Sequence, residues 1–404
     1  MVKVNGSKNA SLPILAGTLL CAGTVKVNNV PQLQDIKNMK DVLSYLGAQV
    51  TCDGKDIIVD GSKIQSLEIS EDLMRRMRAS NLVLGPLLSR FGFVKISYPG
   101  GCNIGSRPMN LHLKGLKAMG AEIKEKFGYI TATTESGLKG AEIHLDVPSV
   151  GATENLMMAA TLAKGTTVLR NTAKEPEVED LQKFLNSMGA KISGAGTDSI
   201  TIEGVDELKP AEHTVIPDRI EAGTYMIAAA VTKSDITLSN VIAEHLKPLI
   251  AKLKETGVEI TINDDNVRVS GVERPKAVDI KTMPYPGFPT DMQPQMMALL
   301  TIAEGTSVIT ETIFENRFKH VAELRRMGAD IQLEGNTAIV RGVPSLTGAY
   351  VEASDLRAGA ALALAAMAAE DGTVLDSIEH IDRGYERIEK QYNSLGARII
   401  RVSS

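Results

Sequence analysis

The chain has 404 residues, of which 23% are charged, and a formal net charge of -5. Its length exceeds one ordinary compact core and predicts two or three domains. The negative net charge excludes the bulk positive field that would hold a nucleic acid backbone or an anionic membrane surface, so any anionic ligand must be bound locally.

The first patterned segment imitates a secretion signal, because Lys3 and Lys8 precede an apolar run at 12–21. The same pattern, a small-residue apolar helix followed by a turn and a β-branched strand, recurs five more times. The six turns contain Gly23, Gly92, Gly165, Ser234, Gly305 and Gly372. Residues 12–21 are therefore predicted to form the first copy of a buried helix. The longest apolar run, 358–369, is shorter than the roughly 20 residues of a membrane span and is predicted to be a core helix.

A second motif, of the type Leu-Gly-Ala, recurs with the same spacing along the chain. Its glycines are 68 to 73 residues apart: Gly47, Gly120, Gly189, Gly257, Gly328 and Gly396. Each follows a stretch with amphipathic helical period and precedes alternating, strand-like residues. Each glycine is predicted to end its helix in a left-handed conformation, where the missing Cβ removes the steric cost.

The two motifs together predict six copies of one unit of about 70 residues. Each unit should contain a strand, an amphipathic helix, a pair of strands and a buried helix. Three plus three units give two similar α/β domains with central helices, one at 9–216 and one combining 1–8 with 217–404. A cleft between two such domains is the expected ligand site. A continuous solenoid is the alternative, but solenoid repeats are shorter, usually about 20 to 50 residues.

Function is expected where the copies differ, in the connection between a strand and the amphipathic helix. In the second copy this connection is the glycine-rich stretch 99–108, which carries Cys102 and Arg107. Such a loop can close over a substrate, although an ordinary surface loop with an incidental thiol is the alternative.

Cations occupy similar connections in other copies, namely Lys8, Arg317, Arg357 and Arg383. They are either solvated surface charges or a convergent set that binds a phosphate and a carboxylate together. Arg357 precedes an alanine-rich helix, where an unpaired guanidinium would be costly, so we expect it to have an anionic partner.

Asp291 opens the small-residue helix of the fifth copy. Two hypotheses remain open for it, an ordinary N-terminal cap and a general base that takes a hydroxyl proton.

Metal and nucleotide motifs are not evident. Cys21, Cys52 and Cys102 lack C-x-x-C spacing, which predicts neither a disulfide framework nor a zinc site and favours a reducing compartment. The histidines lack H-x-x-x-H spacing, and the G-x-G-x-x-G and P-loop patterns are absent.

Nine stretches along the chain resemble the enolpyruvyl transferase family, and within it the enzymes that act on UDP-N-acetylglucosamine. Examples are Gly-Ser-Lys-Asn-Ala at 6–10 and Asp-Leu-Arg-Ala at 355–358. The others lie at 77–80, 99–108, 149–153, 217–221, 288–293, 314–318 and 381–389. The resemblance implies two inside-out α/β barrels of three repeats each. It also implies a cytoplasmic enzyme that transfers the carboxyvinyl group of phosphoenolpyruvate to the sugar 3'-hydroxyl with no metal or organic cofactor, committing the sugar to peptidoglycan.

The resemblance also implies roles for particular residues. Cys102 would be the general acid that protonates C3 of phosphoenolpyruvate, Asp291 the base at the sugar hydroxyl, and Lys8 and Arg383 the remaining catalytic cations. The implied substrate contacts are Lys8, Asn9, Arg78, Arg107, Pro108, Met109, Asn110, Leu111, Ser149, Val150, Gly151, Asp291, Ile313, Arg317, Arg357 and Arg383. The epoxide fosfomycin is expected to alkylate Cys102 and to leave Cys21 and Cys52 unmodified.

The chain departs from the family in two places. Only seven residues precede Lys8, which predicts that one strand of the second domain is missing, and Asn110 stands where many members have Asp. Two functional alternatives stay open: the sister transferase that acts on shikimate 3-phosphate, and a catalytically silent paralogue.

Overall fold

The computed structural model describes residues 1–100, 104–105 and 109–402, and their packing forms two compact units. The N-terminal unit comprises 6–100 and 109–216, and the C-terminal unit comprises 1–5, 104–105 and 217–402. Each unit has its own hydrophobic core. The first boundary falls after Asn5 rather than after Lys8, because Lys8 opens a helix of the N-terminal unit.

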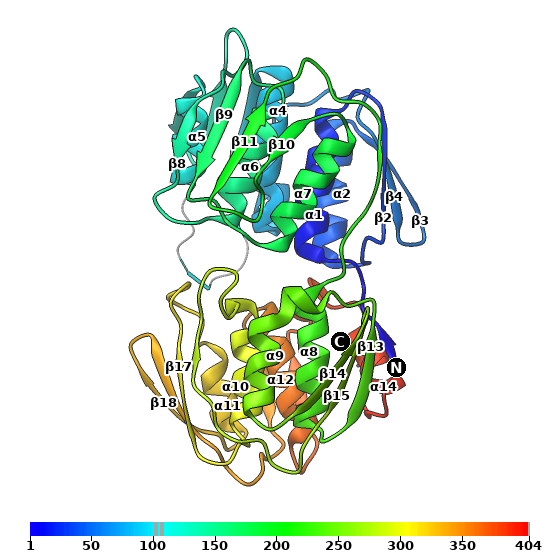
Figure 1. Cartoon of the computed structure of the whole chain (residues 1–404), viewed down its shortest axis with the longest axis vertical. Helices are drawn as coiled ribbons and strands as arrows, with labels where there is room; N and C mark the ends of the chain where they lie inside the picture. Colours follow the sequence, from blue (N-terminus) through cyan, green and yellow to red (C-terminus); the bar gives the residue numbers. More distant parts are fainter. Residues whose placement is uncertain (101–103, 106–108, 403–404) are drawn as a thin grey trace. The chain divides into compact units, whose positions relative to one another are not determined.

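Helices fill the centre of each unit (Figure 1). The N-terminal unit contains α1 (Lys8–Gly17), α4 (Leu84–Phe91) and α6 (Val150–Ala160), and the C-terminal unit contains α8 (Arg219–Val231), α10 (Gln293–Leu300) and α12 (Leu356–Ala368). Every residue of α8 and α10 is buried. Small residues permit the close packing: a Cβ at Gly85 of α4 would lie 2.3 Å from the Asn155 carbonyl oxygen of α6. The predicted buried helices, including those at 12–21 and 358–369, are confirmed.

The amphipathic helices lie outside this centre and end at the predicted glycines. They are α2 (Gln34–Leu46), α5 (Asn110–Ala118), α7 (Pro176–Ser187), α9 (Lys247–Glu255), α11 (His320–Arg326) and α14 (Ile388–Ser394). All six glycines have φ between 90° and 106°, which confirms the left-handed caps. Among the described residues, no helix is long and apolar enough to span a bilayer.

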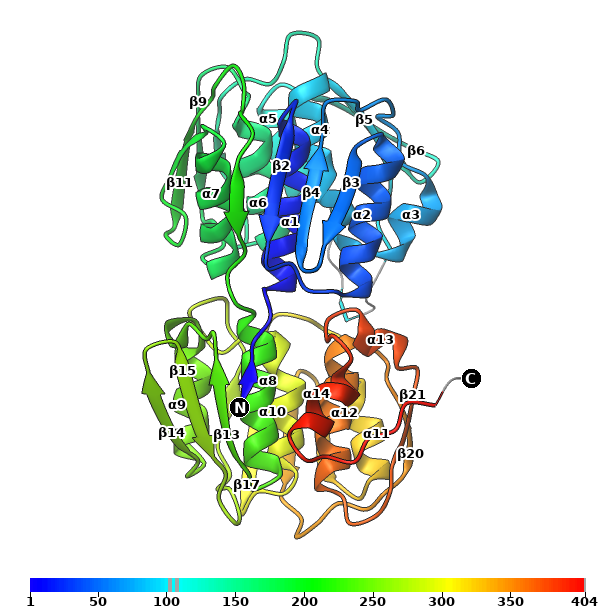
Figure 2. The ribbon, with the colours of Figure 1, turned by 90° about the vertical axis from the view of Figure 1, so that its right-hand side faces the viewer.

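Sheets surround the central helices, so each unit has the inside-out arrangement that the repeat predicts (Figure 2). In the N-terminal unit the sheet orders are β12 (Glu212–Thr214), β2 (Thr24–Asn28), β4 (Asp56–Asp60), β3 (Gln49–Asp53); then β5 (Phe93–Ser97), β7 (Tyr129–Thr133), β6 (Glu122–Lys126); and β10 (Lys191–Ser193), β11 (Ser199–Glu203), β9 (Thr166–Arg170), β8 (Glu142–His144). In the C-terminal unit they are β1 (Val2–Lys3), β13 (Asp235–Ser239), β15 (Asn266–Ser270), β14 (Glu259–Asn263); then β16 (Ile280–Lys281), β17 (Thr306–Thr310), β19 (Thr337–Arg341), β18 (Asp330–Glu334); and β20 (Tyr350–Glu352), β21 (Val374–Asp376).

Each four-stranded sheet contains one parallel pair at its edge and antiparallel pairs elsewhere. The register places alternate residues on the core face, as with Val25 opposite Val59 and Val27 opposite Ile57 in β2 and β4. The predicted strand after Gly396 is wrong, because 397–402 form no strand in the sixth copy, where Ile400 and Val402 are 87% and 79% exposed.

An asparagine that the sequence analysis missed fixes three of the parallel pairs, β12–β2, β8–β9 and β1–β13. Asn29, Asn171 and Asn240 each follow a strand with φ of 60°, 56° and 60°. Their side-chain amides donate to carbonyl oxygens of the neighbouring chain segment at 3.0, 2.8 and 2.8 Å. A short amide side chain tolerates the left-handed conformation and supplies the hydrogen bond, so the recurring Asn after a β-branched strand was the available signal.

Candidate active site

Asp291 lies between two buried arginines of the C-terminal unit, in the short helix η4 (Thr290–Met292) before α10. Its Oδ1 accepts a hydrogen bond from Arg317 Nη2 at 2.8 Å, and its Oδ2 accepts one from Arg357 Nη2 at 3.0 Å. The Arg317 and Arg357 side chains are 2% and 5% exposed, against 28% for Asp291. The carboxylate is therefore the part of this cluster that a ligand can reach.

The capping hypothesis for Asp291 is wrong. Neither η4 nor α10 has a side-chain cap at its N-terminus, and both carboxylate oxygens are bonded to guanidinium groups. The structure thus brings together three residues that the sequence nominates separately: Asp291, Arg317 and Arg357.

Glu311 connects the Asp291 segment to the turn that carries Ile313. This buried side chain accepts from Thr290 Oγ1 at 2.9 Å and from the Ile313 backbone N–H at 2.8 Å. A further hydrogen bond from Thr282 Oγ1 at 2.8 Å ties the carboxylate to the adjoining loop. Sequence analysis missed Glu311, because two of its partners, Thr282 and Thr290, lie 29 and 21 residues away in the chain.

Arg357 is the second residue of α12. Asp355 caps this helix, with Oδ1 accepting from the Arg357 N–H at 2.9 Å and from the Ala358 N–H at 3.1 Å. Burial is the largest single influence and lowers the pKa of Arg357, but Asp291, Tyr385 and Asp218 together raise that pKa above its ordinary value, with Asp291 contributing most. The anionic partner expected for Arg357 is therefore Asp291.

His320, the first residue of α11, lies near this cluster and is neutral. Burial lowers its pKa to about 4, with the Asp355 carboxylate opposing and the Arg317 guanidinium reinforcing the shift. In the part of the chain that the structure describes, both ring nitrogens and the Arg317 Nε are buried without a hydrogen-bond partner. His320 thus adds no positive charge beside Arg317 at neutral pH.

Lys8 opens α1 in the N-terminal unit, where Ser7 caps the helix by accepting from the Ala10 N–H at 3.2 Å. The Lys8 Nζ lies 3.4 Å from Asp35 Oδ2 on α2, with side-chain exposures of 11% and 2%. Asn9, the next residue, is half-buried. The sequence predicts the ammonium group here but not its carboxylate partner, which comes from another helix.

His112 of α5 lies among the predicted sugar contacts of the N-terminal unit. Burial and the nearby positive charge of Arg78 lower its pKa to about 4. A Cβ built on Gly151 would lie 3.5 Å from the His112 Cε1, so a side chain there would narrow the space beside the ring. The structure thus brings Arg78 and Gly151 to one histidine that the sequence analysis did not nominate.

The hydrogen bonds of Asn155 assign the His112 tautomer. Asn155 Oδ1 accepts from the Gly85 N–H at 2.6 Å, and Nδ2 donates to the Asn81 carbonyl at 2.8 Å, which fixes the orientation of the amide. The same Nδ2 lies 3.2 Å from His112 Nδ1, which must therefore accept. The proton of neutral His112 is then on Nε2.

The remaining predicted contacts are placed as follows. Ser149 caps α6 by accepting from the Ala152 N–H at 3.3 Å, and Val150 is half-buried beside it. Met109 and Leu111 are buried, while Asn110 opens α5 with an exposed side chain. Arg383 is half-buried directly after α13 (Glu379–Asp382). Cys102, Arg107 and Pro108 lie outside the described residues.

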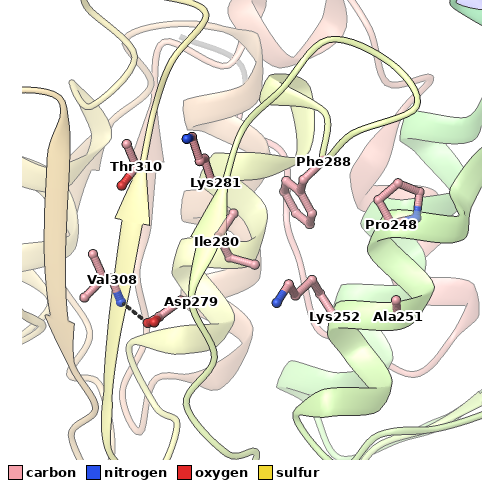
Figure 3. Close-up of a pocket in the computed structure, with 9 residues that line it drawn as sticks. All are labelled: Pro248, Ala251, Lys252, Asp279, Ile280, Lys281, Phe288, Val308 and Thr310. Atoms are coloured by element: carbon pink, nitrogen blue, oxygen red, sulfur yellow. Dashed lines mark hydrogen bonds between the residues drawn. The ribbon is translucent and has the colours of Figure 1, made fainter.

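A pocket of about 490 Å³ opens in the C-terminal unit between α9 and strands β16 and β17 (Figure 3). It is lined by Pro248, Ala251, Lys252, Asp279, Ile280, Lys281, Phe288, Val308 and Thr310. None of these residues belongs to the predicted site. Within the described part of the chain, no group of three or more His, Cys, Asp or Glu side chains could hold a metal ion.

Glu154 of α6 is a buried acid that the sequence analysis did not nominate. It is 3% exposed, and its Oε1 finds no hydrogen-bond partner within residues 1–100, 104–105 and 109–402. Burial raises its pKa well above the ordinary value of 4.5, and the carboxylates of Glu177 and Glu175 raise it further. The folded protein therefore holds the Glu154 proton to a higher pH than the unfolded chain does.

Glu154→Gln is expected to stabilise the protein increasingly as pH rises. The unfolded wild-type chain loses this proton above pH 4.5, whereas the folded chain keeps it, so the stability associated with Glu154 is complete below pH 4.5 and declines above it. Glutamine has no proton to lose. Thermal melting from about pH 5 to about pH 8 should show a widening gap in Tm. Glu135→Gln, an exposed change in the same unit, controls for the altered net charge; a gap independent of pH would contradict the prediction.

Comparison with known proteins agrees with this architecture. Residues 1–392 match the family described as EPSP synthase (3-phosphoshikimate 1-carboxyvinyltransferase). UDP-N-acetylglucosamine 1-carboxyvinyltransferase 1 of Carboxydothermus hydrogenoformans is 59% identical over 402 residues, which cover 100% of this chain and 95% of that protein. UDP-N-acetylglucosamine 1-carboxyvinyltransferase of Geobacter metallireducens is 56% identical over 401 residues, with coverage of 99% and 96%.

Solved structures show the same fold. The enolpyruvyl transferase NikO from Streptomyces tendae has a TM-score of 0.88 at 26% identity, over 98% of this chain and 94% of that one. EPSP synthase from Acinetobacter baumannii has a TM-score of 0.76 at 19% identity, over 97% and 94%, and shows the fold alone. Because the match spans nearly the whole chain and its full-length relatives share more than half of its residues, the chain belongs to the enolpyruvyl transferase family, on the branch of the UDP-N-acetylglucosamine 1-carboxyvinyltransferases.

Proposed function

We propose that this chain transfers the carboxyvinyl group of phosphoenolpyruvate to the 3'-hydroxyl of UDP-N-acetylglucosamine and releases phosphate, as the first committed step of peptidoglycan synthesis in the cytoplasm. The observation that carries the proposal is full-length identity of 56% to 59% to proteins named for this transfer. The Asp291 cluster supports it, because a partly exposed carboxylate held by two guanidinium groups is suited to accept a hydroxyl proton.

In the proposed mechanism, Asp291 accepts the 3'-hydroxyl proton as that oxygen bonds to C2 of phosphoenolpyruvate. The Cys102 thiol protonates C3 in the same addition. The bond from C2 to the phosphate oxygen then breaks, C3 returns a proton to the Cys102 thiolate, and the proton held by Asp291 passes to the leaving phosphate. The products are the carboxyvinyl ether and phosphate. The acid lies in the sequence range 9–216 and the base in 217–404, so the reaction requires both parts of the chain at one substrate.

We assign two roles to the positively charged side chains. Lys8, Arg107 and Arg383 bind the phosphate or the anionic intermediate. Arg317 and Arg357 both bond to Asp291, which favours a role in ordering the base over a role confined to the substrate carboxylate.

The sugar nucleotide is assigned to the N-terminal unit. Its contacts are Asn9, Arg78, the stretch 107–111 and Ser149 to Gly151, and Ile313 joins them from the C-terminal unit. The Asn110 side chain is exposed at the start of α5, where its amide can contribute a polar contact to the uridine end.

The test is phosphate release by the purified protein from phosphoenolpyruvate with either UDP-N-acetylglucosamine or shikimate 3-phosphate as acceptor. We expect phosphate release with UDP-N-acetylglucosamine as acceptor and none with shikimate 3-phosphate. The family description names the shikimate reaction, but the full-length relatives are named for the reaction with the sugar nucleotide. Equal release with shikimate 3-phosphate would favour the sister transferase. No release with either acceptor would favour a silent paralogue.

A further inference from the structure

We propose that Tyr385 is a positioning residue for the base: its buried hydroxyl fixes the Arg357 guanidinium so that the guanidinium presents one amino group to Asp291. The inference rests on the proposed function in one respect, since it takes Asp291 to be the base. The sequence analysis assigned no role to Tyr385 or to two of its partners, Thr224 and Gln295.

The guanidinium of Arg357 has two partners. Its Nη2 donates to Asp291 Oδ2 at 3.0 Å, and its Nη1 donates to Tyr385 Oη at 3.1 Å. The guanidinium carbon also lies 5.6 Å from the centroid of the Tyr385 ring. Because the guanidinium is planar, a fixed Nη1 also fixes the direction of Nη2.

The Tyr385 hydroxyl contacts one side chain from each of the three central helices of the C-terminal unit. Thr224 Oγ1 of α8 is 2.8 Å from it, and Gln295 Nε2 of α10 is 3.3 Å from it. Arg357 comes from α12. Each central helix therefore contributes one side chain that contacts this hydroxyl. Tyr385 as a whole is 4% exposed.

The donors and acceptors available in this network determine which group donates each hydrogen bond. Arg357 and the Gln295 amide nitrogen can only donate, so Tyr385 Oη accepts from them. Thr224 Oγ1 is 2.8 Å from the Ile220 carbonyl, which can only accept. The arrangement that gives every hydroxyl proton an acceptor is Arg357 to Tyr385, Tyr385 to Thr224, and Thr224 to Ile220.

This direction requires a neutral Tyr385. Burial raises the pKa of Tyr385, and burial outweighs the opposing effects of the Arg357 charge and of the hydrogen bonds. The hydroxyl therefore keeps the proton that it donates to Thr224. The end of the network is a backbone carbonyl of α8, which does not move independently of the helix.

Loss of the Tyr385 hydroxyl would release Arg357 Nη1. The freed guanidinium can then turn and bond both oxygens of Asp291, since paired bonds to a carboxylate are its preferred geometry. An additional guanidinium hydrogen bond would stabilise the carboxylate and make Asp291 a weaker base. The substrate contacts of the N-terminal unit would not change.

The experiment compares Tyr385→Phe with Tyr392→Phe. Tyr392 Oη is buried in the same unit and has no hydrogen-bond partner among the described residues, so this control deletes an equally buried hydroxyl that does no positioning. Tyr385→Phe is expected to lower kcat between about 10-fold and about 100-fold, with KM for UDP-N-acetylglucosamine within about twofold, and to move the acidic limb of the pH profile to lower pH. Tyr392→Phe should keep the wild-type kcat.

Thr224 separates positioning from a merely structural role. Thr224→Val removes the acceptor for the Tyr385 proton and should lower kcat in the same direction, whereas Thr224→Ser keeps the hydroxyl and should restore it. Wild-type turnover in the same assay tests the proposed function separately. A Tyr385→Phe enzyme with wild-type kcat and pH profile would overturn the inference while leaving that function intact. Equal losses in Thr224→Val and Thr224→Ser that match their loss of folded protein in thermal melts would also overturn it.

Discussion

Asp291→Asn is expected to lower kcat by about 10²-fold to about 10⁴-fold, the usual contribution of a positioned acid or base. Asparagine has nearly the shape of the aspartate, but its amide cannot take the proton of the sugar hydroxyl. KM for UDP-N-acetylglucosamine should change little, because the proposed sugar contacts belong mainly to the N-terminal unit. Steady-state phosphate release at saturating phosphoenolpyruvate measures both constants.

The same substitution leaves two buried guanidinium groups without their shared counter-charge. Loss of one partner of a buried pair costs about 3 to 5 kcal/mol, and the partial exposure of Asp291 reduces this to about 1 to 3 kcal/mol. Thermal melting must therefore accompany the kinetics. Asp279→Asn is the control: Asp279 is exposed in the same unit, and its Oδ1 accepts from the Val308 N–H at 2.8 Å, a bond that asparagine can keep. A folded Asp291→Asn enzyme within about threefold of the wild-type kcat would reject the base assignment.

Cys102→Ala should also reduce phosphate release by about 10²-fold to about 10⁴-fold, because C3 of phosphoenolpyruvate would lose its proton donor. Fosfomycin should inactivate the wild-type enzyme by alkylating the Cys102 thiolate. Mass spectrometry of the treated protein locates the adduct, and release of phosphate before and after treatment measures the inactivation.

The structure shows which other thiol could compete. Cys21 is buried, and burial raises its pKa, so it should be unreactive. Cys52 is exposed, and Lys40 Nζ lies 3.3 Å from its sulfur. The alkylation is therefore best measured in a Cys52→Ser background, which should keep full activity and full sensitivity. The proposed role of Cys102 as the acid would be rejected if fosfomycin no longer inactivated the Cys52→Ser enzyme. It would also be rejected if Cys102→Ala kept wild-type turnover.

The repeated elements were predictable because they depend on neighbours along the chain. The six cap glycines and the six turns before a strand each follow from local backbone conformation and hydrophobic period, and the structure has all of them. The strand expected after Gly396 does not form, because a strand depends on a partner elsewhere in the chain and not only on its own neighbours. A strand needs a partner, and none of the described strands pairs with 397–402, so alternation there was not sufficient.

The sequence by itself determined the six-copy α/β architecture, its buried helices and the identity of the charged residues that the family uses. Only the tertiary structure decided what those charges do to one another. Asp291 could equally have been a helix cap until Arg317 and Arg357 were found on its two oxygens. Asp35, His112, Glu311 and Tyr385 act through partners on other elements. The physical reason is that a hydrogen bond requires contact within about 3 Å, whereas a pattern along the chain specifies only which side chains share a face.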